Sequence, residues 1–238
     1  MSAIRWLAAG TDYDSFPPPD TALDEPNGLL AAGGDLSPER LLIAYRSGIF
    51  PWYERGQPIL WWSPDPRAVL LPGELRVSRS LRRTVRRGTF RITADTAFER
   101  VIRGCAGPRS YGTATWITKE MAAAYIELHR RGWAHSFEAW AGDELAGGLY
   151  GVAIGRVFFG ESMFSRATDA SKAAFVSAVR YLESRAFELI DCQVASAHMR
   201  SLGATDMPRH RFLARLEALC DAPRPAASWT CDHMGSSP

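Results

Sequence analysis

Hydrophobic and polar positions change their period twice between residues 156 and 194, and these changes predict three elements. Residues 156–164 are rich in aromatic and β-branched side chains, which are typical of a strand. Apolar side chains then recur at helical spacing over residues 170–185, and residues 187–194 return to strand character. A strand, a helix and a strand in this order predict two parallel strands joined by a right-handed crossover.

The pattern upstream of this unit predicts two helices and an antiparallel meander. A capping-box pattern at Thr96 starts the first helix, and the second helix covers residues 119–131. Strands at residues 135–139 and 145–152 then form a meander with the strand at 156–164. The acyltransferase fold called GNAT has the same order of elements: two helices, an antiparallel meander, and then a helix and a strand that runs parallel to the last strand of the meander. We therefore expect an α+β protein whose main domain is GNAT-like, with a mixed sheet.

Proline, glycine and aromatic residues set the N-terminal region apart. Residues 16–35 have the composition of a shaped loop. Ser37 followed by Pro38 predicts the start of a helix that Gly48 ends. Three of the eight tryptophans lie between Trp52 and Trp62, which indicates a small aromatic core or a ligand wall in equal measure.

Two prolines, at positions 64 and 66, mark a domain boundary because helical structure cannot continue through them. We predict a small N-terminal domain over residues 1–63 and a GNAT-like domain over residues 64–238. From about Pro223 the composition is that of a loose tail.

Bulk composition indicates a globular protein without a membrane anchor. The chain has 238 residues, of which 46% are hydrophobic and 23% are charged, and no apolar run approaches the length of a transmembrane helix. Its cysteines, Cys105, Cys192, Cys220 and Cys231, stand far apart and form no CxxC pair. We therefore expect a reduced, cytoplasmic protein that binds no metal.

Positive charge is concentrated on one short predicted helix, although the formal net charge is only +2. The predicted helix covers residues 80–87, and no acid occurs between Arg76 and Arg91. Exposed helix faces normally mix charges of both signs, so a polyanion such as nucleic acid explains the run better than solvation does. The candidate RNA-binding residues are Arg79, Arg82, Arg83, Arg86 and Arg87.

Polar side chains interrupt the apolar runs of both predicted parallel strands, at Glu161 on the first strand and at Asp191 and Gln193 on the second. A strand-end acid that reaches solvent is the simplest explanation for any one of them, but carboxylates in apolar runs are rarely buried unless paired or used. Polar groups on two adjacent strands favour a shared cleft. Residues 165–172 contain no glycine to admit a pyrophosphate, so we expect an acyl group carried on RNA and not on coenzyme A.

Short motifs spread along residues 16–219 resemble those of the bacterial leucyl/phenylalanyl-tRNA–protein transferases. They are EPNGLL at 25–30, GGDLS at 33–37, GIFPW at 48–52, WWSPDPR at 61–67, TWIT at 115–118, GESMFSR at 160–166, ASK at 170–172, LIDCQV at 189–194 and SLGA at 201–204. The first fifteen residues and the tail carry no match.

The resemblance implies transfer of Leu or Phe, with Met as a third candidate donor, from aminoacyl-tRNA to proteins that begin with Arg or Lys. The product would carry an N-degron and be degraded. The implied partners are Leu-tRNA, Phe-tRNA and the acceptor proteins, and no cofactor is implied. We expect a monomer.

The resemblance also assigns roles to individual residues. It places the catalytic pair on Asp191 and Gln193, and it makes Glu161 a substrate-binding residue. The tryptophans beside the adenosine are Trp52 and Trp116, and the amino-acid pocket comprises Tyr125, Leu149, Phe158 and Ile190. Ala178 departs from the family pattern, where a bulkier residue is expected, and Phe175 lies one turn earlier as its replacement.

The implied chemistry needs neither ATP nor a metal, because an amine that attacks an ester forms an amide directly. Near neutral pH only a minority of an α-amine with a pKa of about 7.7–8.0 is free, so a carboxylate that takes its proton helps. Asp191 with Gln193 is our candidate for this step, while Glu161 holds either the 3′-adenosine or the cationic N-terminal residue. Strand alternation points Cys192 into the core. We expect His135 and His198 to be structural.

Two other classes of function stay open. A peptidoglycan-type aminoacyltransferase would also use aminoacyl-tRNA, but its acceptor would be a cell-wall precursor. A non-catalytic RNA-binding protein would have no need of Asp191.

Overall fold

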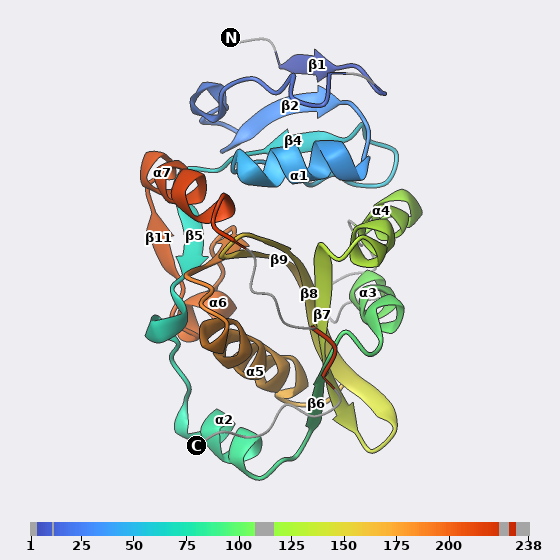
Figure 1. Ribbon diagram of the computed structural model, residues 1–238, viewed down its shortest axis with the longest axis vertical. Coiled ribbons are helices and arrows are strands. Elements are labelled where there is room, and N and C mark those ends of the chain that lie inside the picture. The colour runs from blue at the N-terminus through green and yellow to red at the C-terminus, as the bar shows by residue number, and fades with distance from the viewer. Residues whose placement is uncertain (1–3, 11, 108–116, 224–228, 232–238) are drawn as a thin grey trace.

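The structure is a computed structural model, which describes residues 4–10, 12–107, 117–223 and 229–231. A four-stranded sheet formed by the N-terminal residues lies above a larger mixed sheet (Figure 1). Its order is β1-β2-β4-β3, and β1 pairs with β2 in parallel while the other neighbours are antiparallel. The elements of this part are β1 Arg5–Leu7, η1 Pro19–Thr21, β2 Leu29–Gly33, α1 Pro38–Arg46, β3 Phe50–Pro51 and β4 Leu60–Trp62.

The N-terminal region confirms one local prediction and corrects another. Helix α1 begins where Ser37 and Pro38 predict, because the Ser37 side chain accepts a hydrogen bond from the Arg40 amide. The stretch 16–35, expected to be loop, contains the strand β2. Its apolar run is buried along its whole length between two neighbouring strands, which outweighs the many prolines and glycines around it.

The larger sheet has seven strands in the order β11-β5-β10-β9-β8-β7-β6. Strands β9 and β10 are parallel, as the period change predicts, and the other pairs of this sheet are antiparallel. The strands are β5 Arg67–Leu70, β6 Arg91–Ala94, β7 Ala134–Ala141, β8 Glu144–Ile154, β9 Val157–Ser165, β10 Leu189–Gln193 and β11 Thr205–Met207.

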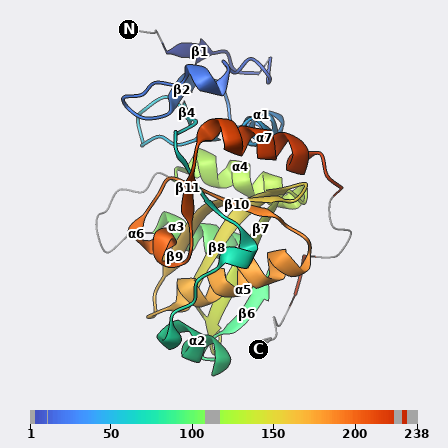
Figure 2. The ribbon, with the colours of Figure 1, turned by 90° about the vertical axis from the view of Figure 1, so that its left-hand side faces the viewer.

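Helices cover both faces of this sheet. Helix α5 lies on one face, and α3 and α4 lie on the other (Figure 1). Side chains of β8 point alternately to the two faces of the sheet. Leu149 and Ala153 belong to the apolar cluster under α5, and Tyr150 and Val152 belong to the cluster on the opposite side. The helices are α2 Arg79–Arg86, α3 Phe98–Ala106, α4 Lys119–Arg130, α5 Ala170–Ser184, α6 Ala197–Ser201 and α7 Arg209–Cys220, with a short η2 at Pro72–Glu74. Figure 2 shows α7 beside α1, where both pack into one core cluster.

The capping box predicted for α3 is wrong. The residue before the helix is Ala97, whose side chain caps nothing, and the Thr96 hydroxyl instead donates to Glu138 at 3.0 Å. Glu138 is completely buried on β7, where an unpaired carboxylate would be costly. Thr96 and the Ser136 hydroxyl are among the donors that satisfy it.

Two described residues of the C-terminal tail, Trp229 and Cys231, make specific contacts, although the composition predicts a loose segment there. The Trp229 ring stacks on His135 with 3.6 Å between centroids, and its carbonyl accepts a hydrogen bond from Tyr181. Cys231 exchanges two backbone hydrogen bonds with Ala94 at the edge strand β6, beside which the red segment of Figure 1 runs. The division of the chain after residue 63 stays a prediction.

Candidate active site

A cavity forms where β9 and β10 part. The two strands pair from Val157 to Phe159, whereas β9 continues beside β8 as far as Ser165. Beyond Phe159 the backbones of β9 and β10 no longer pair, and a cavity of about 320 Å³ lies between the two strands. Strand geometry thus brings the residues that follow Gly160 and Asp191 to opposite sides of one space.

Glu161 stands at this cavity with neutral donors around its carboxylate. Tyr45 and Tyr125 each donate a hydroxyl at 2.7 Å, one to each carboxylate oxygen, and Gln193 donates its side-chain amide at 2.8 Å. The two tyrosine hydroxyls also touch each other. Burial raises the pKa of the Glu161 carboxyl to about 7, the charge of Asp191 adds to the rise, and the three hydrogen bonds oppose it.

Asp191 has no exposed surface and is paired with an arginine. Arg67 of β5 donates from Nε to one carboxylate oxygen at 2.8 Å and from Nη2 to the other at 2.7 Å. The guanidinium is itself buried, lies between the rings of Phe50 and Phe212 at 4.7 Å from each, and donates to the Gly48 carbonyl. This is a two-pronged ion pair sealed from water.

Gln193 connects the two carboxylates. Its backbone amide donates to Asp191 at 2.9 Å, and its side chain donates to Glu161. The residue has a φ of 61°, a left-handed conformation that is uncommon outside glycine, and the pairing of β10 with β5 shifts register at this point. A local bulge therefore turns the Gln193 side chain toward β9.

The cavity wall contains most of the residues predicted for the amino-acid pocket. Leu149, Phe158 and Ile190 line it together with Phe175 of α5. Ala178 is buried in the cluster under α5. The other residues around the cavity are Tyr150, Gly160, Glu161, Ser162, Met163, Asp191, Cys192, Val194, Ser196, His198 and Met199.

Two predicted residues, Tyr125 and Trp52, do not line the cavity. Tyr125 is buried behind the wall and reaches Glu161 only with its hydroxyl. Trp52 is 45% exposed, and its ring packs at a tilt against that of Trp62 with 5.6 Å between centroids. Trp116 lies outside the described residues. Cys192 packs against the apolar cluster under α5, as strand alternation predicts, and like Ile190 it also lines the cavity, where burial raises its pKa.

The sequence analysis missed Tyr45 and Arg67 as site residues. Tyr45 occupies an apolar position of α1, and Arg67 is the last residue of a proline-rich motif. Nothing in their neighbourhood along the chain marks either residue as a partner of a strand 116 or 124 positions away.

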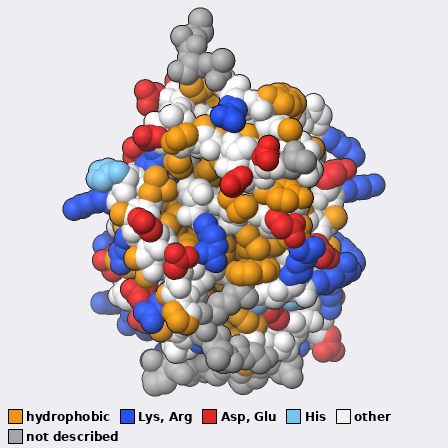
Figure 3. Space-filling model, turned by 45° about the horizontal axis from the view of Figure 1, so that its top comes forward, with side chains coloured by type: hydrophobic (Ala, Val, Ile, Leu, Met, Phe, Trp, Pro, Cys, Tyr) orange, Lys and Arg blue, Asp and Glu red, His pale blue; other side chains and the backbone are white. Residues whose placement is uncertain are grey.

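The arginines of α2 form an exposed basic surface, as predicted. The Ser78 side chain caps the helix by accepting from the Leu81 amide, and Leu81 is its buried anchor. Arg79, Arg82, Arg83, Arg86 and Arg87 are all exposed. Helix α2 lies at the opposite end of the molecule from the four-stranded sheet (Figure 1). On the face drawn in Figure 3, hydrophobic side chains gather near the middle, and most Lys and Arg side chains lie toward the sides.

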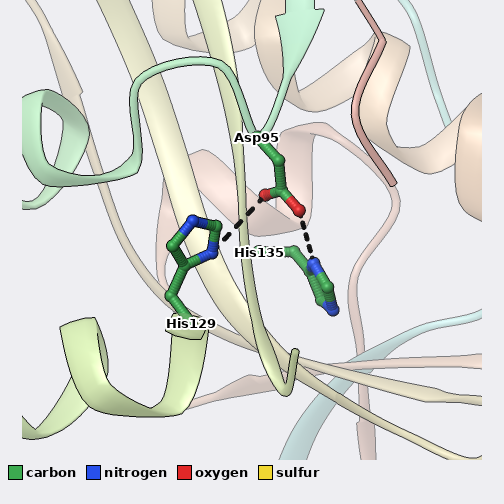
Figure 4. A group of neighbouring side chains, drawn as sticks. All are labelled: Asp95, His129 and His135. Atoms are coloured by element: carbon green, nitrogen blue, oxygen red, sulfur yellow. Dashed lines mark hydrogen bonds and ion pairs between the residues drawn. The ribbon is translucent and has the colours of Figure 1, made fainter. Parts of the chain in front are cut away.

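Asp95 lies between His129 and His135, and the three residues offer ligand atoms of the types that bind metal ions within 4.8 Å of one another (Figure 4). The hydrogen bonds favour a structural role. His129 Nδ1 lies 2.8 Å from the Ala134 carbonyl, which can only accept, so this nitrogen carries a proton. His135 Nδ1 lies 2.7 Å from Asp95, and its ring packs on Trp229. His198 instead lines the cavity, where burial and then Lys172 lower its pKa.

Comparison with known proteins gives consistent matches along the chain. The family described as leucyl/phenylalanyl-tRNA protein transferase matches residues 69–217, and its N-terminal domain matches residues 34–65. A leucyl/phenylalanyl-tRNA–protein transferase of Stutzerimonas stutzeri is 61% identical over 226 residues, which are 95% of this chain and 99% of that protein. One from Nitrosospira multiformis is 56% identical over 230 residues, 97% of this chain and 98% of that protein. The solved structure of L-PGS from Bacillus licheniformis is 9% identical with a TM-score of 0.39, covering 70% of this chain and 53% of that one, which supports no conclusion.

Proposed function

The chain belongs to the leucyl/phenylalanyl-tRNA–protein transferase family, and from this premise we propose that it moves Leu or Phe from aminoacyl-tRNA to proteins that begin with Arg or Lys. The bond formed is an amide at the acceptor α-amine, and the bond broken is the ester to the tRNA ribose. We propose that the modified protein carries an N-degron. Met is a further candidate donor.

The observation that carries this proposal is the apolar cavity that ends at polar groups. Its volume of about 320 Å³ is near the lower end of the roughly 300–1,000 Å³ of ligand pockets, as a single amino-acid side chain requires. Leu149, Phe158, Phe175 and Ile190 supply an apolar wall for Leu or Phe. Glu161 at the same cavity supplies the polar group next to which the ester would lie.

The exposed arginines of α2 supply the RNA-binding part of the proposal. Five cations on and beside one eight-residue helix attract a phosphate backbone without reading its sequence. We propose that they contact the acceptor stem of the tRNA and that Trp52 and Trp116 contact its terminal adenosine.

The remaining assignments follow from the same premise. The order of α3, α4, the meander β7-β8-β9, α5 and β10 supports a GNAT-like fold for residues 64–238. No described helix has the length and apolarity needed to cross a bilayer. We propose a cytoplasmic monomer, because aminoacyl-tRNA is found in the cytoplasm and the proposed chemistry uses one chain.

A direct assay tests the proposal. The purified protein is incubated with labelled Leu-tRNA or Phe-tRNA and a peptide that begins with Arg. Label should appear at the peptide N-terminus and should be absent when the same peptide is N-acetylated or begins with Asp.

Transfer of label to a cell-wall precursor and not to the peptide would support a peptidoglycan-type enzyme instead. Binding of aminoacyl-tRNA without any transfer would support a non-catalytic RNA-binding protein.

A further inference from the structure

The two carboxylates near the cavity differ in the hydrogen-bond donors that their oxygens meet and in their exposure to the cavity. Both oxygens of Asp191 accept from Arg67, and one also accepts from the Gln193 amide. The Asp191 side chain has no exposed surface. A proton from an incoming amine would therefore have to break a buried, two-pronged ion pair and leave the Arg67 cation buried without its partner, which is strongly unfavourable.

Glu161 has the opposite surroundings. It keeps exposed surface at the cavity, and the donors that meet it are two phenols and one amide, all neutral. A carboxylate held by neutral donors can accept a proton and turn one hydroxyl around without leaving a buried charge unpaired.

From this contrast, and resting on the proposed function, we propose that Glu161 is the catalytic residue that takes the proton from the attacking amine. Arg67 is a positioning residue that holds Asp191, and Asp191 in turn holds the Gln193 backbone in its left-handed turn so that the Gln193 side chain orients Glu161.

The proposed step is balanced. The amine nitrogen forms a bond to the ester carbonyl carbon, the bond from that carbon to the ribose 3′-oxygen breaks, and the electron pair leaves with the oxygen. Glu161 takes the proton from nitrogen and returns it to the 3′-oxygen. A group that accepts and then donates a proton works best with a pKa near the working pH, and burial brings the pKa of Glu161 to about 7.

The neighbours of Glu161 do not obscure its titration. Burial and the charge of Glu161 raise the pKa values of Tyr45 on α1 and Tyr125 on α4 well above the ordinary tyrosine value. Burial likewise raises the pKa of Cys192 and lowers that of His198, both of which line the cavity. Asp191 is paired with Arg67, and Tyr150 of β8 is buried.

The test compares pH profiles of the transfer rate. Rates are measured in single turnover with subsaturating Arg-initiated peptide and are divided by the fraction of free amine, which removes the titration of the acceptor. The wild-type profile should then rise to a plateau with an apparent pKa near 7. Glu161→Gln should lose this rise and should fall at least about 100-fold at pH 8, the lower end of general-base effects.

The matched variant changes the ion pair without leaving a lone buried charge. In Arg67→Gln combined with Asp191→Asn, the side-chain amide introduced at position 67 takes the place of the arginine Nε and keeps a hydrogen bond to the residue at position 191. We expect this pair to keep the rise near pH 7 and to stay within about tenfold of the wild-type rate. Should it fail to fold, Arg67→Lys keeps one of the two hydrogen bonds and the charge, and it should lower kcat with KM for aminoacyl-tRNA and the pH profile unchanged.

Persistence of the rise in Glu161→Gln, or its loss in a folded Arg67 variant, would overturn this inference. A wild-type protein that transfers nothing to the Arg-initiated peptide would refute the proposed function itself. Normal wild-type transfer with an unaffected Glu161→Gln variant would refute only the role of Glu161.

Discussion

Glu161 and Asp191 are both acids on adjacent parallel strands, yet the residues opposite them give them different chemistry. Asp191 faces Arg67 in a site closed by Phe50 and Phe212. Glu161 faces tyrosines and an amide. Desolvation therefore acts on Glu161 without a cation to oppose it, and its carboxyl group prefers to hold a proton.

This preference predicts a pH dependence of folding stability. Because burial raises the pKa of Glu161 from its ordinary value of 4.5 to about 7, the folded protein binds more protons there than the unfolded chain does. The resulting stabilisation is fully present below pH 4.5 and is lost as the pH rises through 7, amounting to at most about 3 kcal/mol. Between pH 5 and pH 8 the wild type should lose more free energy of unfolding in urea than Glu161→Gln does.

An exposed acid provides the control for that measurement. Glu127 on α4 is 40% exposed and pairs with Arg131, so Glu127→Gln should follow the wild-type change between the two pH values. An equal change in wild type and Glu161→Gln would show that Glu161 titrates alike in the folded and unfolded chains.

At the scale of elements, α2 combines a small apolar side, with Leu81 buried and Val85 half-buried, and an exposed cationic surface. Leu81 fixes the helix, and the arginines are left to solvent. Like charges at helical spacing repel one another, so this arrangement stabilises the protein less than a mixed face would. The arginine content of α2 is accordingly better explained by the proposed contact with RNA than by folding stability.

Removal of two arginines from α2 should weaken RNA binding in a salt-dependent way. For Arg82→Ala with Arg83→Ala, the slope of log affinity for aminoacyl-tRNA against log salt should become shallower by about 0.7–0.9 for each phosphate that is no longer neutralised. The double variant Arg103→Ala with Arg130→Ala removes the same charge from exposed positions of α3 and α4, and it should leave the slope unchanged. Equal slopes in both double variants would place the RNA surface elsewhere.

At the scale of the whole molecule, the end of the chain returns to the main sheet. Trp229 packs against His135 and Phe137 of β7, Tyr181 of α5 and Phe187 before β10. Phe137 in turn meets Phe158 of the cavity wall with 6.1 Å between centroids. Trp229 therefore supports Phe158 of the cavity wall through Phe137. It does not line the cavity itself.

Trp229→Ala should lower the free energy of unfolding by about 2 kcal/mol, somewhat less than the roughly 3–5 kcal/mol of a fully buried aromatic because the side chain is half-buried. Trp229→Phe should recover part of that loss through its ring contacts. Thermal and urea unfolding measure the effect, with Cys231→Ala as a control because Cys231 bonds β6 through its backbone. A Trp229→Ala variant as stable as wild type would mean that the tail is dispensable for folding.

The order of residues along the chain determined several secondary-structure elements of this protein. The change of period over residues 156–194 predicts β9, α5 and β10, Ser37 predicts the start of α1, and the arginine run predicts an exposed basic helix. Each of these features depends on residues that lie close together in the sequence. Over that range, helix and strand geometry determines which side chains share a face.

Tertiary structure alone decided how the site is built. Glu161 meets tyrosines 116 and 36 positions away, and Asp191 meets an arginine 124 positions away. The register shift between β10 and β5 falls at Gln193, which takes a left-handed conformation and donates its side-chain amide to Glu161. Which cation or hydroxyl faces a buried carboxylate depends on how sheets and helices from distant parts of the chain pack together, and the spacing of residues along the chain does not contain that information.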